Sequence, residues 1–370
     1  MSMNIVHLVP TEIPINSEFG GAVQKRALAL ISEQNTLGHL AIALSPGRTA
    51  MHQETDQSIR IINLHLPRPW RDFEYMFKAR RFIRKSGIKF DVVHSHGLPL
   101  VSLFTPSGIT TILTVDYFRY KYSETKLGWL IYRFALIGFT KVVCVSKYCQ
   151  REFSSFFKIS DAIVIYNGVD LNVNETVPQY SEAVLYRYGL QDQEFVLYLG
   201  RICEQKGSKL LPLIAQHLKE LSSGLRLVAA GPDSHFGNDS SDFSRFEHAE
   251  VTYLGSIHDD EVPILLAKAK ALVLPTIRDE MFGMVIPEAL AQGTPVVASN
   301  LGGIPEALGG GGILFEVGDY VACTNAIELV SAEGRLREEV IASGRKHITR
   351  FQWPLISDAY ILIYQGVTSA

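Results

Sequence analysis

Short apolar runs of four to seven residues recur along the chain, and many are followed by a segment whose apolar residues repeat every three to four positions. Such runs are typical of buried parallel strands, and such segments are typical of amphipathic helices. The strands predicted in the first half are residues 4–10, 40–44, 90–94, 110–115, 142–146 and 162–166. Those predicted in the second half are residues 195–199, 225–230, 251–254, 271–274 and 294–299. The alternation predicts an α/β protein with parallel sheets.

The alternation stops at residues 171–180, which are polar and unpatterned, and restarts beyond them. A chain of 370 residues also exceeds the size that one hydrophobic core usually supports. We therefore predict two domains, residues 1–172 and 191–353, joined by a linker at 173–190.

The two halves also differ in charge. Residues 1–170 hold 20 Lys and Arg against 13 Asp and Glu, a net +7, whereas residues 171–370 hold 15 against 25, a net −10. The halves therefore have different partners, or one of them faces an anionic surface.

The overall composition, with 47% hydrophobic and 20% charged residues, is typical of a soluble globular protein. The first apolar run has neither the basic region nor the cleavage site of a secretory signal. The longest apolar stretch, residues 127–139, contains Arg133 and is too short to span a bilayer. The four cysteines lack metal-ligand spacing and are typical of reduced thiols, so we expect a cytoplasmic protein.

Residues 66–90 carry eight Lys and Arg against Asp72 and Glu74, with aromatic residues interleaved. A helix there would have an apolar face and a basic flank, which is the pattern of a helix that docks on an anionic membrane. Residues 117–139 repeat the mixture. The alternative is an ordinary helix with a solvated face. The repeat favours peripheral contact of both segments with the inner face of the membrane.

Candidate chemistry is concentrated in the loop after the predicted strand 271–274. Glu280 lies in this loop, and Glu288 lies on the helix that follows it. Both acids therefore border the carboxyl edge of the sheet, where open α/β sheets bind ligands. From position alone they suit either a general acid and base or two groups that bind hydroxyls.

Three predicted strands of the second half end in a glycine: Gly200, Gly231 and Gly255. Glycine lets a ligand approach the backbone closely. Arg201 and Lys206 follow the first of them, and an arginine fork with a lysine point charge suits the oxygens of a diphosphate. The alternative for both cations is a solvated surface.

In the first half, Gly20 and Gly21 lie between the first predicted strand and a helix predicted at residues 22–37. Backbone N–H groups at such a helix N-terminus donate hydrogen bonds to a phosphate, although a glycine pair there is as often a tight turn. A dinucleotide site is disfavoured, because the spacing is not G-x-G-x-x-G and the next strand does not end in an acid.

His94 and His96 end the predicted strand 90–94 and its turn, and alternation places them on one side of it. Metal sites use this spacing, but the sequence shows no third ligand, so we expect one buried histidine and one that faces a cleft. No Asp-x-Asp follows a predicted strand either, and we therefore expect no metal.

Taken in order, these features resemble the retaining glycosyltransferases of family 4. The matching segments are GGAVQKR, DVVHSHG, VSKYC, NGVD, LGRICEQKG, EMFGMVIPEALAQGTPVVAS and GGIPE, which together run nearly the length of the chain. The resemblance implies the GT-B fold, with two facing Rossmann-like domains, parallel sheets and a cleft between the domains. It also implies that the final helix, residues 354–370, crosses back at Trp353 to pack on the first domain.

The resemblance further implies roles at matching positions. Arg201 and Lys206 match residues that bind the donor diphosphate. Glu280 matches a residue that contacts hydroxyls of the donor sugar, and Glu288 one that binds the ribose hydroxyls. His96 and Tyr117 are expected on the acceptor side. The remaining donor-binding positions are Gly20, Gly21, Gly200, Gly231, Gly255, Ile257, Phe282, Gly283, Met284 and Val285.

One position departs from the family. Relatives commonly carry a histidine near the donor sugar at the end of the strand 110–115, where this chain has Asp116. A carboxylate accepts hydrogen bonds from sugar hydroxyls, but a diphosphate repels it. We expect Asp116 to act as a catalytic group there, with Tyr117 or Arg119 as alternatives.

The resemblance thus predicts transfer of a hexose from a nucleotide diphosphate sugar, here a UDP-sugar, to a hydroxyl of a glycan or lipid-linked acceptor. Anomeric configuration is retained, and the product belongs to cell-surface polysaccharide or glycoconjugate synthesis. No cofactor, required metal or nucleic acid partner is expected. Two alternatives remain, an epimerase-like isomerase of UDP-sugars and an inactive sugar-nucleotide-binding protein.

Overall fold

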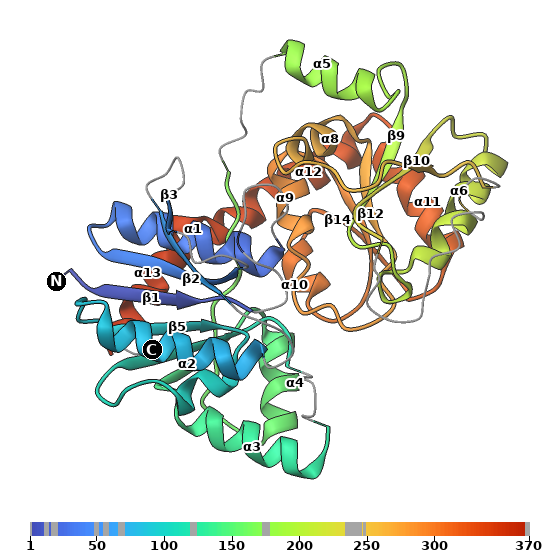
Figure 1. Ribbon diagram of the computed structural model, residues 1–370. Coiled ribbons are helices and arrows are strands. Elements are labelled where there is room, and N and C mark those ends of the chain that lie inside the picture. Colours follow the sequence, from blue (N-terminus) through green and yellow to red (C-terminus); the bar gives the residue numbers. More distant parts are fainter. Residues whose placement is uncertain are drawn as a thin grey trace. The chain divides into compact units, whose positions relative to one another are not determined.

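The structure is a computed structural model that describes residues 2–10, 15, 21–47, 52–54, 59–65, 71–118, 124–171, 178–233, 246 and 249–366. The chain separates into two compact units (Figure 1). Unit 1 is Met1–Gly168 with Trp353–Ala370, and unit 2 is Val169–Gln352. Each unit is built on its own sheet with helices on both faces, so the predicted α/β class is confirmed.

Unit 1 contains an eight-stranded sheet in the order β3-β4-β2-β1-β5-β6-β7-β8. All neighbours are parallel except β3 and β4, which are antiparallel. The sequence pattern does not predict β3 or β4, since β3 has three residues and β4 has polar ends. The strands are β1 (Asn4–Leu8), β2 (Leu40–Gly47), β3 (His52–Glu54), β4 (Arg60–His65), β5 (Val92–His96), β6 (Thr110–Val115), β7 (Lys141–Cys144) and β8 (Ile163–Val164).

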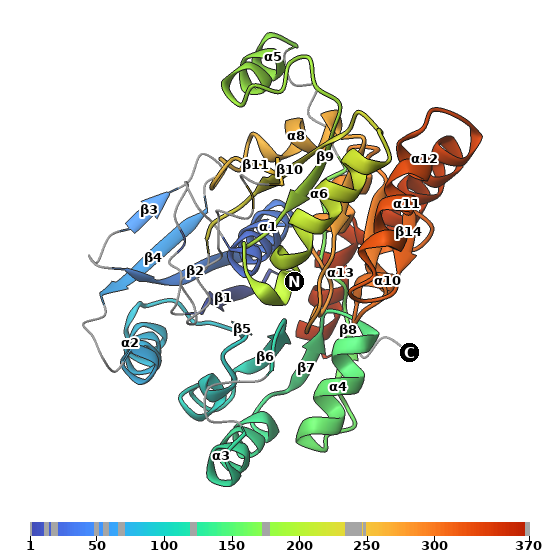
Figure 2. The same ribbon diagram turned by 90° about the vertical axis from the view of Figure 1, so that its right-hand side faces the viewer.

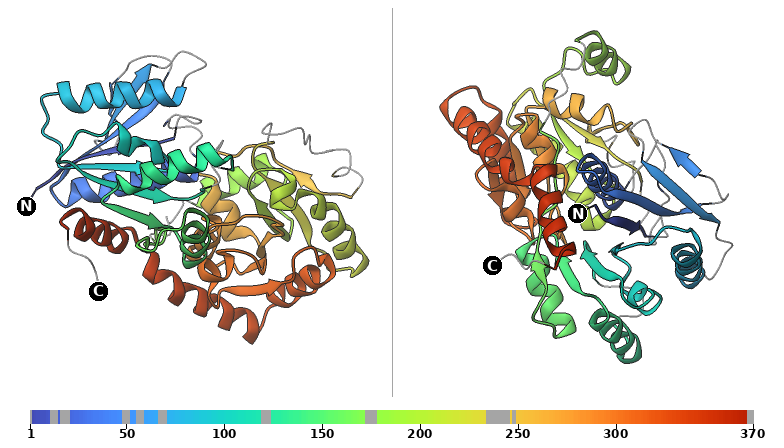
Figure 3. Two further views of the ribbon diagram at one scale, coloured as in Figure 1. Left: turned by 90° about the horizontal axis from the view of Figure 1, so that it is seen from below. Right: turned by 90° about the vertical axis from the view of Figure 1, so that its left-hand side faces the viewer.

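Five α-helices of unit 1 cover the two faces of this sheet. On one face lie α1 (Ala22–Thr36) and α13 (Trp353–Tyr364). On the other lie α2 (Arg71–Lys85), α3 (Lys126–Ile137) and α4 (Lys147–Phe157), with the 3₁₀ turn η1 (Pro99–Leu103) beside α3 (Figure 2). Figure 3 shows α2 and α13 on opposite sides of the sheet. This arrangement follows from right-handed crossovers, because the chain moves one way along the sheet after β1 and the other way after β4.

The final helix is part of the core of unit 1. Ile356, Tyr360 and Ile363 of α13 are buried in the same cluster as apolar residues of β1 and α1. A Cβ added to Gly168 would lie 2.2 Å from the Trp353 ring, so only glycine fits where β8 ends beside the start of α13.

Unit 2 contains a six-stranded sheet in the order β11-β10-β9-β12-β13-β14, with all neighbours parallel. Its strands β12 and β13 are buried along their whole length and β9 is buried except at Leu199, as expected for a sheet covered on both faces. The strands are β9 (Phe195–Leu199), β10 (Arg226–Ala230), β11 (Thr252–Tyr253), β12 (Ala271–Leu274), β13 (Val296–Ser299) and β14 (Gly312–Phe315).

Helices again cover both faces of the second sheet. On one face α6 (Leu211–Glu220) packs on α11 (Tyr320–Ser331). The other face carries α8 (Val262–Lys268), α9 (Val285–Ala291), α10 (Ile304–Leu308) and α12 (Arg335–Ile348) (Figure 1). The described part of the unit also contains the 3₁₀ turns η2 (Glu204–Lys206), η3 (Ser208–Leu210) and η4 (Thr349–Phe351).

Residues 173–190, predicted as a linker, differ from that expectation. They contain the helix α5 (Pro178–Arg187), and the boundary between the units falls earlier, at Gly168. Arg187 forms an ion pair with the buried Glu261, and the Tyr188 hydroxyl donates a hydrogen bond to Glu261 Oε2 at 2.7 Å. These contacts fix α5 beside α8. They come from residues beyond the polar run at 171–180, which is why the sequence pattern does not show them.

No helix in the described ranges combines the length and the hydropathy that a membrane-spanning segment requires. The four cysteines are free thiols, and Cys144, Cys149 and Cys323 are buried.

Candidate active site

The carboxyl edge of the second sheet brings the three predicted glycines together. The Gly200 N–H donates to the Ala230 carbonyl at 3.0 Å, and the Gly231 N–H donates to the Gly255 carbonyl at 2.8 Å. A Cβ on Gly231 would lie 2.0 Å from the Gly200 carbonyl oxygen. Glycine is therefore required at Gly231 for the backbones of neighbouring loops to approach each other.

The loop after β9 is held against the loop after β12. Gly207 has a left-handed φ of +79°, and a Cβ there would lie 1.8 Å from the Pro275 carbonyl oxygen. The Ile277 N–H donates to the Gln205 carbonyl at 3.0 Å. Because β9 and β12 are neighbours in the sheet, these contacts place Lys206 beside the acidic loop.

Lys206 and Glu280 form an ion pair in which the two side chains are 26% and 16% exposed. Asp279, just before Glu280, has a left-handed φ of +46°, a conformation that Asp adopts more readily than most residues. The Gly303 N–H donates to the Glu280 carbonyl at 2.8 Å, which ties this loop to the turn after β13. Arg201, the second predicted cation, is exposed, and its carbonyl accepts a hydrogen bond from Tyr198 at 2.6 Å.

The segment that leads into α9 offers backbone rather than side chains. The Phe282 side chain is buried against Phe351, with ring centroids 5.4 Å apart. Gly283 has a φ of +87°, and a Cβ there would lie 3.7 Å from Glu280 Cγ. Helix α9 begins at Val285, and the first N–H groups of a helix have no partner within it. Of the predicted set, Phe282, Gly283 and Met284 can therefore contribute amides close to Glu280.

Glu288 lies in the first turn of α9 and is half-buried. Pro287, one residue earlier, occupies a position where a missing N–H costs no helical hydrogen bond, as the sequence predicts. On the other side of the sheet edge, Gly255 is followed by Ile257, whose side chain is buried. Ser256, between these two residues, is exposed, so the backbone of that turn and the Ser256 side chain are open to a ligand.

The carboxyl edge of the first sheet holds a different group, centred on Arg26 of α1. Its guanidinium is 1% exposed and forms an ion pair with Asp116, which follows β6 and is 21% exposed. Arg26 donates to Asp116 Oδ2 at 2.7 Å, to Asn167 Oδ1 at 3.2 Å and to His96 Nδ1 at 3.0 Å. Burial lowers the pKa of Arg26, but the charge and hydrogen bonds of Asp116 outweigh burial and raise that pKa above its ordinary value.

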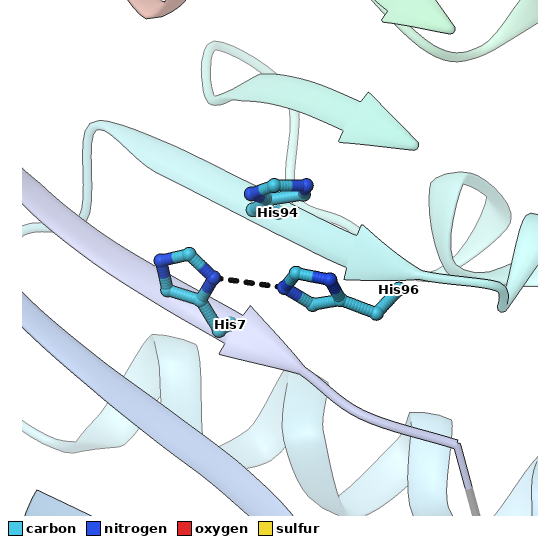
Figure 4. A group of neighbouring side chains, drawn as sticks. All are labelled: His7, His94 and His96. Carbon is cyan, nitrogen blue, oxygen red and sulfur yellow. Dashed lines mark hydrogen bonds between the residues drawn. The ribbon is translucent and has the colours of Figure 1, made fainter. Parts of the chain in front are cut away.

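Arg26 also fixes the protonation of the histidines beside it. A guanidinium only donates, so His96 Nδ1 accepts from it and His96 carries its proton on Nε2. That nitrogen lies 2.9 Å from His7 Nδ1 (Figure 4). His7 Nε2 lies 2.8 Å from Gln34 Oε1. His96 therefore donates to His7, and His7 donates to Gln34.

The series of hydrogen bonds continues from Gln34 to the final helix. Gln34 Nε2 donates to the Tyr364 hydroxyl at 3.3 Å, and that hydroxyl lies 2.6 Å from His94 Nδ1. His94 Nε2 lies 2.7 Å from Thr114 Oγ1, which contacts the Tyr360 hydroxyl at 2.8 Å. His94 thus connects the Tyr364 hydroxyl to the Thr114 hydroxyl. We call this series, from Arg26 to Tyr360, the Arg26 chain.

His7, His94 and His96 lie within the distances at which three histidines hold a metal ion, since their nearest ring nitrogens are all within 4.8 Å of one another. His7 is the third ligand that the sequence pattern misses. However, all six ring nitrogens have hydrogen-bond partners, and the Arg26 guanidinium lies directly against His96. A cation is repelled there, so the cluster is better described as a hydrogen-bonded core.

The prediction that one histidine of the pair is buried and the other faces a cleft is wrong. Both His94 and His96 are 0% exposed, because α13 covers the first and Arg26 covers the second. His96, predicted on the acceptor side, thus acts on the site only through Arg26.

Two of the remaining predicted residues of unit 1 lie in the described ranges. Tyr117 is 47% exposed and Gly21 is the N-cap of α1, whereas Gly20 and Arg119 lie outside the described residues. Arg26 itself lies in the segment GGAVQKR, but its partners come from three other strand ends, so local pattern gives no sign of its role.

Known proteins that are similar to this chain identify its family. Residues 187–347 match the family model of glycosyl transferases group 1, and residues 19–173 match that of glycosyltransferase family 4. The glycosyltransferase MJ1178 of Methanocaldococcus jannaschii is 28% identical over 312 residues, which cover 80% of this chain and 82% of that protein. The phosphatidyl-myo-inositol mannosyltransferase of Mycolicibacterium smegmatis is 24% identical over 388 residues, which cover 96% of this chain and 93% of that protein.

A solved structure shares the fold of the whole chain. HepE of Anabaena, in complex with UDP-glucose, aligns with a TM-score of 0.76 at 18% identity and covers 98% of this chain and 100% of its own. This likeness shows the GT-B fold. The two family models show that the chain is a glycosyltransferase. The chain belongs to glycosyltransferase family 4, as the resemblance predicts.

The buried histidines make the stability of unit 1 depend on pH. Burial, more than any other cause, lowers the pKa of His7 to about 4 and those of His94 and His96 well below their usual value. In the unfolded chain these rings take up protons near pH 6.5. Their contribution to stability is therefore complete above pH 6.5 and is lost as the pH falls toward 4. For His7 alone, the loss between pH 7 and pH 5 is about 2 kcal/mol.

We expect His7→Gln to remove about 2 kcal/mol of the fall in unfolding free energy between pH 7 and pH 5. Urea unfolding followed by tryptophan fluorescence measures this, since all three tryptophans (Trp70, Trp129 and Trp353) belong to unit 1. His258→Gln, in unit 2, is the control and leaves the fall unchanged. Equal pH dependence of wild type and His7→Gln contradicts the assignment.

Proposed function

We propose that this protein is a retaining, metal-independent hexosyltransferase. It takes a hexose from a nucleotide diphosphate sugar, with UDP as the nucleotide, and transfers it to a hydroxyl of a glycan or lipid-linked acceptor. We further propose that it works in the cytoplasm at the inner face of the membrane, in the synthesis of cell-surface polysaccharide or glycoconjugates. The observation that carries the proposal is the Lys206–Glu280 ion pair at the carboxyl edge of the second sheet.

This pair unites the two chemistries that a nucleotide sugar demands. Lys206 supplies a positive charge for the diphosphate, and Glu280 supplies carboxylate oxygens that accept hydrogen bonds from sugar hydroxyls. In the absence of a ligand each charge is balanced by the other, so neither is left uncompensated in a partly buried loop. When a nucleotide sugar binds, its charged diphosphate takes the place of Glu280 beside Lys206, and its sugar hydroxyls take the place of Lys206 beside Glu280.

Two relatives support the choice of donor and acceptor. HepE of Anabaena is solved in complex with UDP-glucose, which supports a UDP-sugar. The mannosyltransferase of M. smegmatis is named for phosphatidyl-myo-inositol, which supports an acceptor that carries a lipid.

Transfer breaks the bond between the anomeric carbon and the leaving phosphate oxygen, and the bonding electrons stay on the diphosphate. Arg201, Lys206 and the amides that lead into α9 are placed to stabilise this negative charge. The acceptor oxygen bonds to the anomeric carbon on the face that the phosphate leaves, and its proton passes to a leaving phosphate oxygen. No carboxylate base is needed, so Glu280 and Glu288 remain binders of sugar and ribose hydroxyls.

Asp116 fits this scheme as a carboxylate whose charge is already balanced. Beside a diphosphate a lone carboxylate is repelled, but the ion pair with Arg26 offsets that repulsion. Because Asp116 is 21% exposed whereas Arg26 is 1% exposed, the pair presents the carboxylate to solvent. We assign it the acceptance of a hydrogen bond from a sugar hydroxyl, at the position where relatives carry histidine.

Changes at the proposed donor site should separate catalysis from binding. We expect Lys206→Ala to lower kcat by roughly 10²- to 10³-fold, as for the loss of one preorganised group that stabilises developing charge. Glu288→Gln should mainly weaken donor binding, by about 10- to 100-fold, because it removes charged hydrogen bonds to the ribose. Release of UDP from UDP-sugars and calorimetric binding of UDP measure the two effects.

Lys209→Ala is the matched control for Lys206→Ala. Lys209 lies three residues further on, is 56% exposed and pairs with Glu204 on the surface. Its replacement should change neither quantity by more than about twofold. Unchanged donor turnover in both Lys206→Ala and Glu288→Gln would refute the proposed site.

A second set of changes tests Asp116. We expect Asp116→Asn to lower the unfolding free energy of unit 1 by about 3 kcal/mol, because the buried guanidinium loses its counter-charge. Replacing both partners, with Arg26→Met and Asp116→Leu, should restore part of that stability, because no unpaired charge is left buried although His96 and Asn167 lose a donor. Transfer should stay roughly 10- to 100-fold below wild type in the double variant, since the acceptor for a sugar hydroxyl is missing. Wild-type transfer by the stable double variant would show that the pair is only structural.

A further inference from the structure

The outer side of α3 exposes five large apolar side chains in one row. These are Leu127, Leu130, Ile131, Phe134 and Ile137, which are 69%, 58%, 44%, 67% and 70% exposed. Their spacing of three and four residues places them on one helix face about 15 Å long. The other exposed residue of α3 is Lys126, and the helix contains no acidic residue. We call this face the α3 ridge.

The ridge is not a core face that awaits packing, because the inner side of α3 is already fixed to unit 1. Leu136 is buried. Trp129 Nε1 donates to the Phe156 carbonyl at 2.8 Å, and Arg133 donates to the Phe157 carbonyl at 2.8 Å. The helix is therefore rigidly held and apolar on both sides, which is unusual for a helix with one side in water.

Helix α2 continues this surface on the same face of the sheet (Figure 2). Phe73 and Phe77 are 49% and 61% exposed, and their rings lie 6.2 and 5.0 Å from that of Phe104. Phe104 follows η1, which packs against α3. Phe82, also in the predicted segment, is instead turned toward Phe90 in the interior, so the surface of α2 is narrower than the sequence predicts.

The flank of this surface is positively charged. Residues 72–89 and 124–137 hold eight basic and three acidic residues, a net +5. Of the acids, Glu74 pairs with Lys78 at 2.5 Å. The basic residues are Lys78, Arg80, Arg81, Arg84, Lys85, Lys89, Lys126 and Arg133, and the acidic ones are Asp72, Glu74 and Glu124.

We propose that the α3 ridge, together with the basic flank of α2, docks unit 1 on the surface of an anionic lipid bilayer. A row of protruding apolar side chains enters the boundary of headgroups and acyl chains without a complementary groove, while Lys and Arg remain at the level of the headgroups. The net charge selects anionic lipids. A second copy of this chain fits less well, because it brings two basic flanks together.

Docking of this kind gives the enzyme access to an acceptor held in the membrane. That consequence rests on the proposed function, whereas binding to lipid does not. The two are separable, because vesicle binding is measured without any nucleotide sugar and UDP binding is measured without vesicles.

The test is co-sedimentation of the whole protein with vesicles of phosphatidylcholine alone and of phosphatidylcholine with phosphatidylglycerol. We expect binding to the anionic vesicles that weakens at high salt. Leu130→Gln with Phe134→Gln should weaken it at least tenfold, because two apolar side chains no longer enter the bilayer. Arg84→Gln with Lys85→Gln should lower the preference for anionic vesicles by about tenfold.

The control is Leu355→Gln with Leu362→Gln, which removes two leucines of α13 that are 53% and 41% exposed on the opposite face of the same sheet. It should bind vesicles as wild type does. Leu127→Gln with Ile137→Gln provides a second ridge variant if the first does not fold, and urea unfolding followed by tryptophan fluorescence reports the folding of unit 1 in every variant.

Three results would overturn the proposal. Wild type fails to bind anionic vesicles, a folded ridge variant binds them as wild type does, or wild type is a dimer in solution that the ridge variant converts to a monomer. The last result assigns the ridge to a second copy of the chain.

Discussion

A guanidinium that cannot lose its proton is buried in unit 1, and the polar interior of that unit is arranged around it. Its two terminal nitrogens donate to acceptors at or just beyond the ends of three strands, His96, Asp116 and Asn167, whereas its buried Nε has no partner among the described residues. Because Arg26 only donates, the directions of the hydrogen bonds from Arg26 through His96 and His7 to Gln34 follow from it. The chain ends on two tyrosines of the final helix, which is how the last residues of the sequence become part of the first domain.

The constraint in unit 2 is geometric rather than electrostatic. Parallel strands end at a common edge, so loops that are 74 residues apart in the sequence meet through Lys206 and Glu280. Backbone approaches at Gly207 and Gly231 leave no space for a Cβ, and these glycines therefore fix how the loops lie on one another. The donor site is then a set of backbone amides with few charged side chains, and most of its precision comes from loop packing.

Local patterns in the sequence predict much of this arrangement of strands and loops. Period and length identify most strands of both sheets, although not β14, which follows a glycine-rich turn, and a glycine after a strand marks the loops that approach closely. The short β3 and β4 and the helix α5 have no comparable pattern, since α5 is attached by Arg187 and Tyr188 to a glutamate more than 70 residues away. Contacts between residues so far apart in the sequence do not produce a periodic pattern of apolar residues.

The same limit applies to the site. The sequence predicts that Lys206 and Glu280 belong to one edge, but it does not show that they pair with each other. It marks Asp116 as a departure from the family, yet the residue that makes this carboxylate tolerable, Arg26, appears only as one polar position in a helix. Likewise, alternation places His94 and His96 on one side of β5 but does not reveal that His7 and α13 bury them.

The central claim, a retaining sugar transfer from a UDP-sugar, is tested most directly by the stereochemistry of the first product. Purified protein is incubated with UDP-glucose and water as the acceptor, and proton NMR spectra are recorded before the sugar mutarotates. A retaining enzyme releases UDP with α-glucose as the first anomer, the same configuration as in the donor. If β-glucose appears first, retention is contradicted. If none of UDP-glucose, UDP-galactose and UDP-N-acetylglucosamine releases UDP, transfer from a UDP-sugar is contradicted.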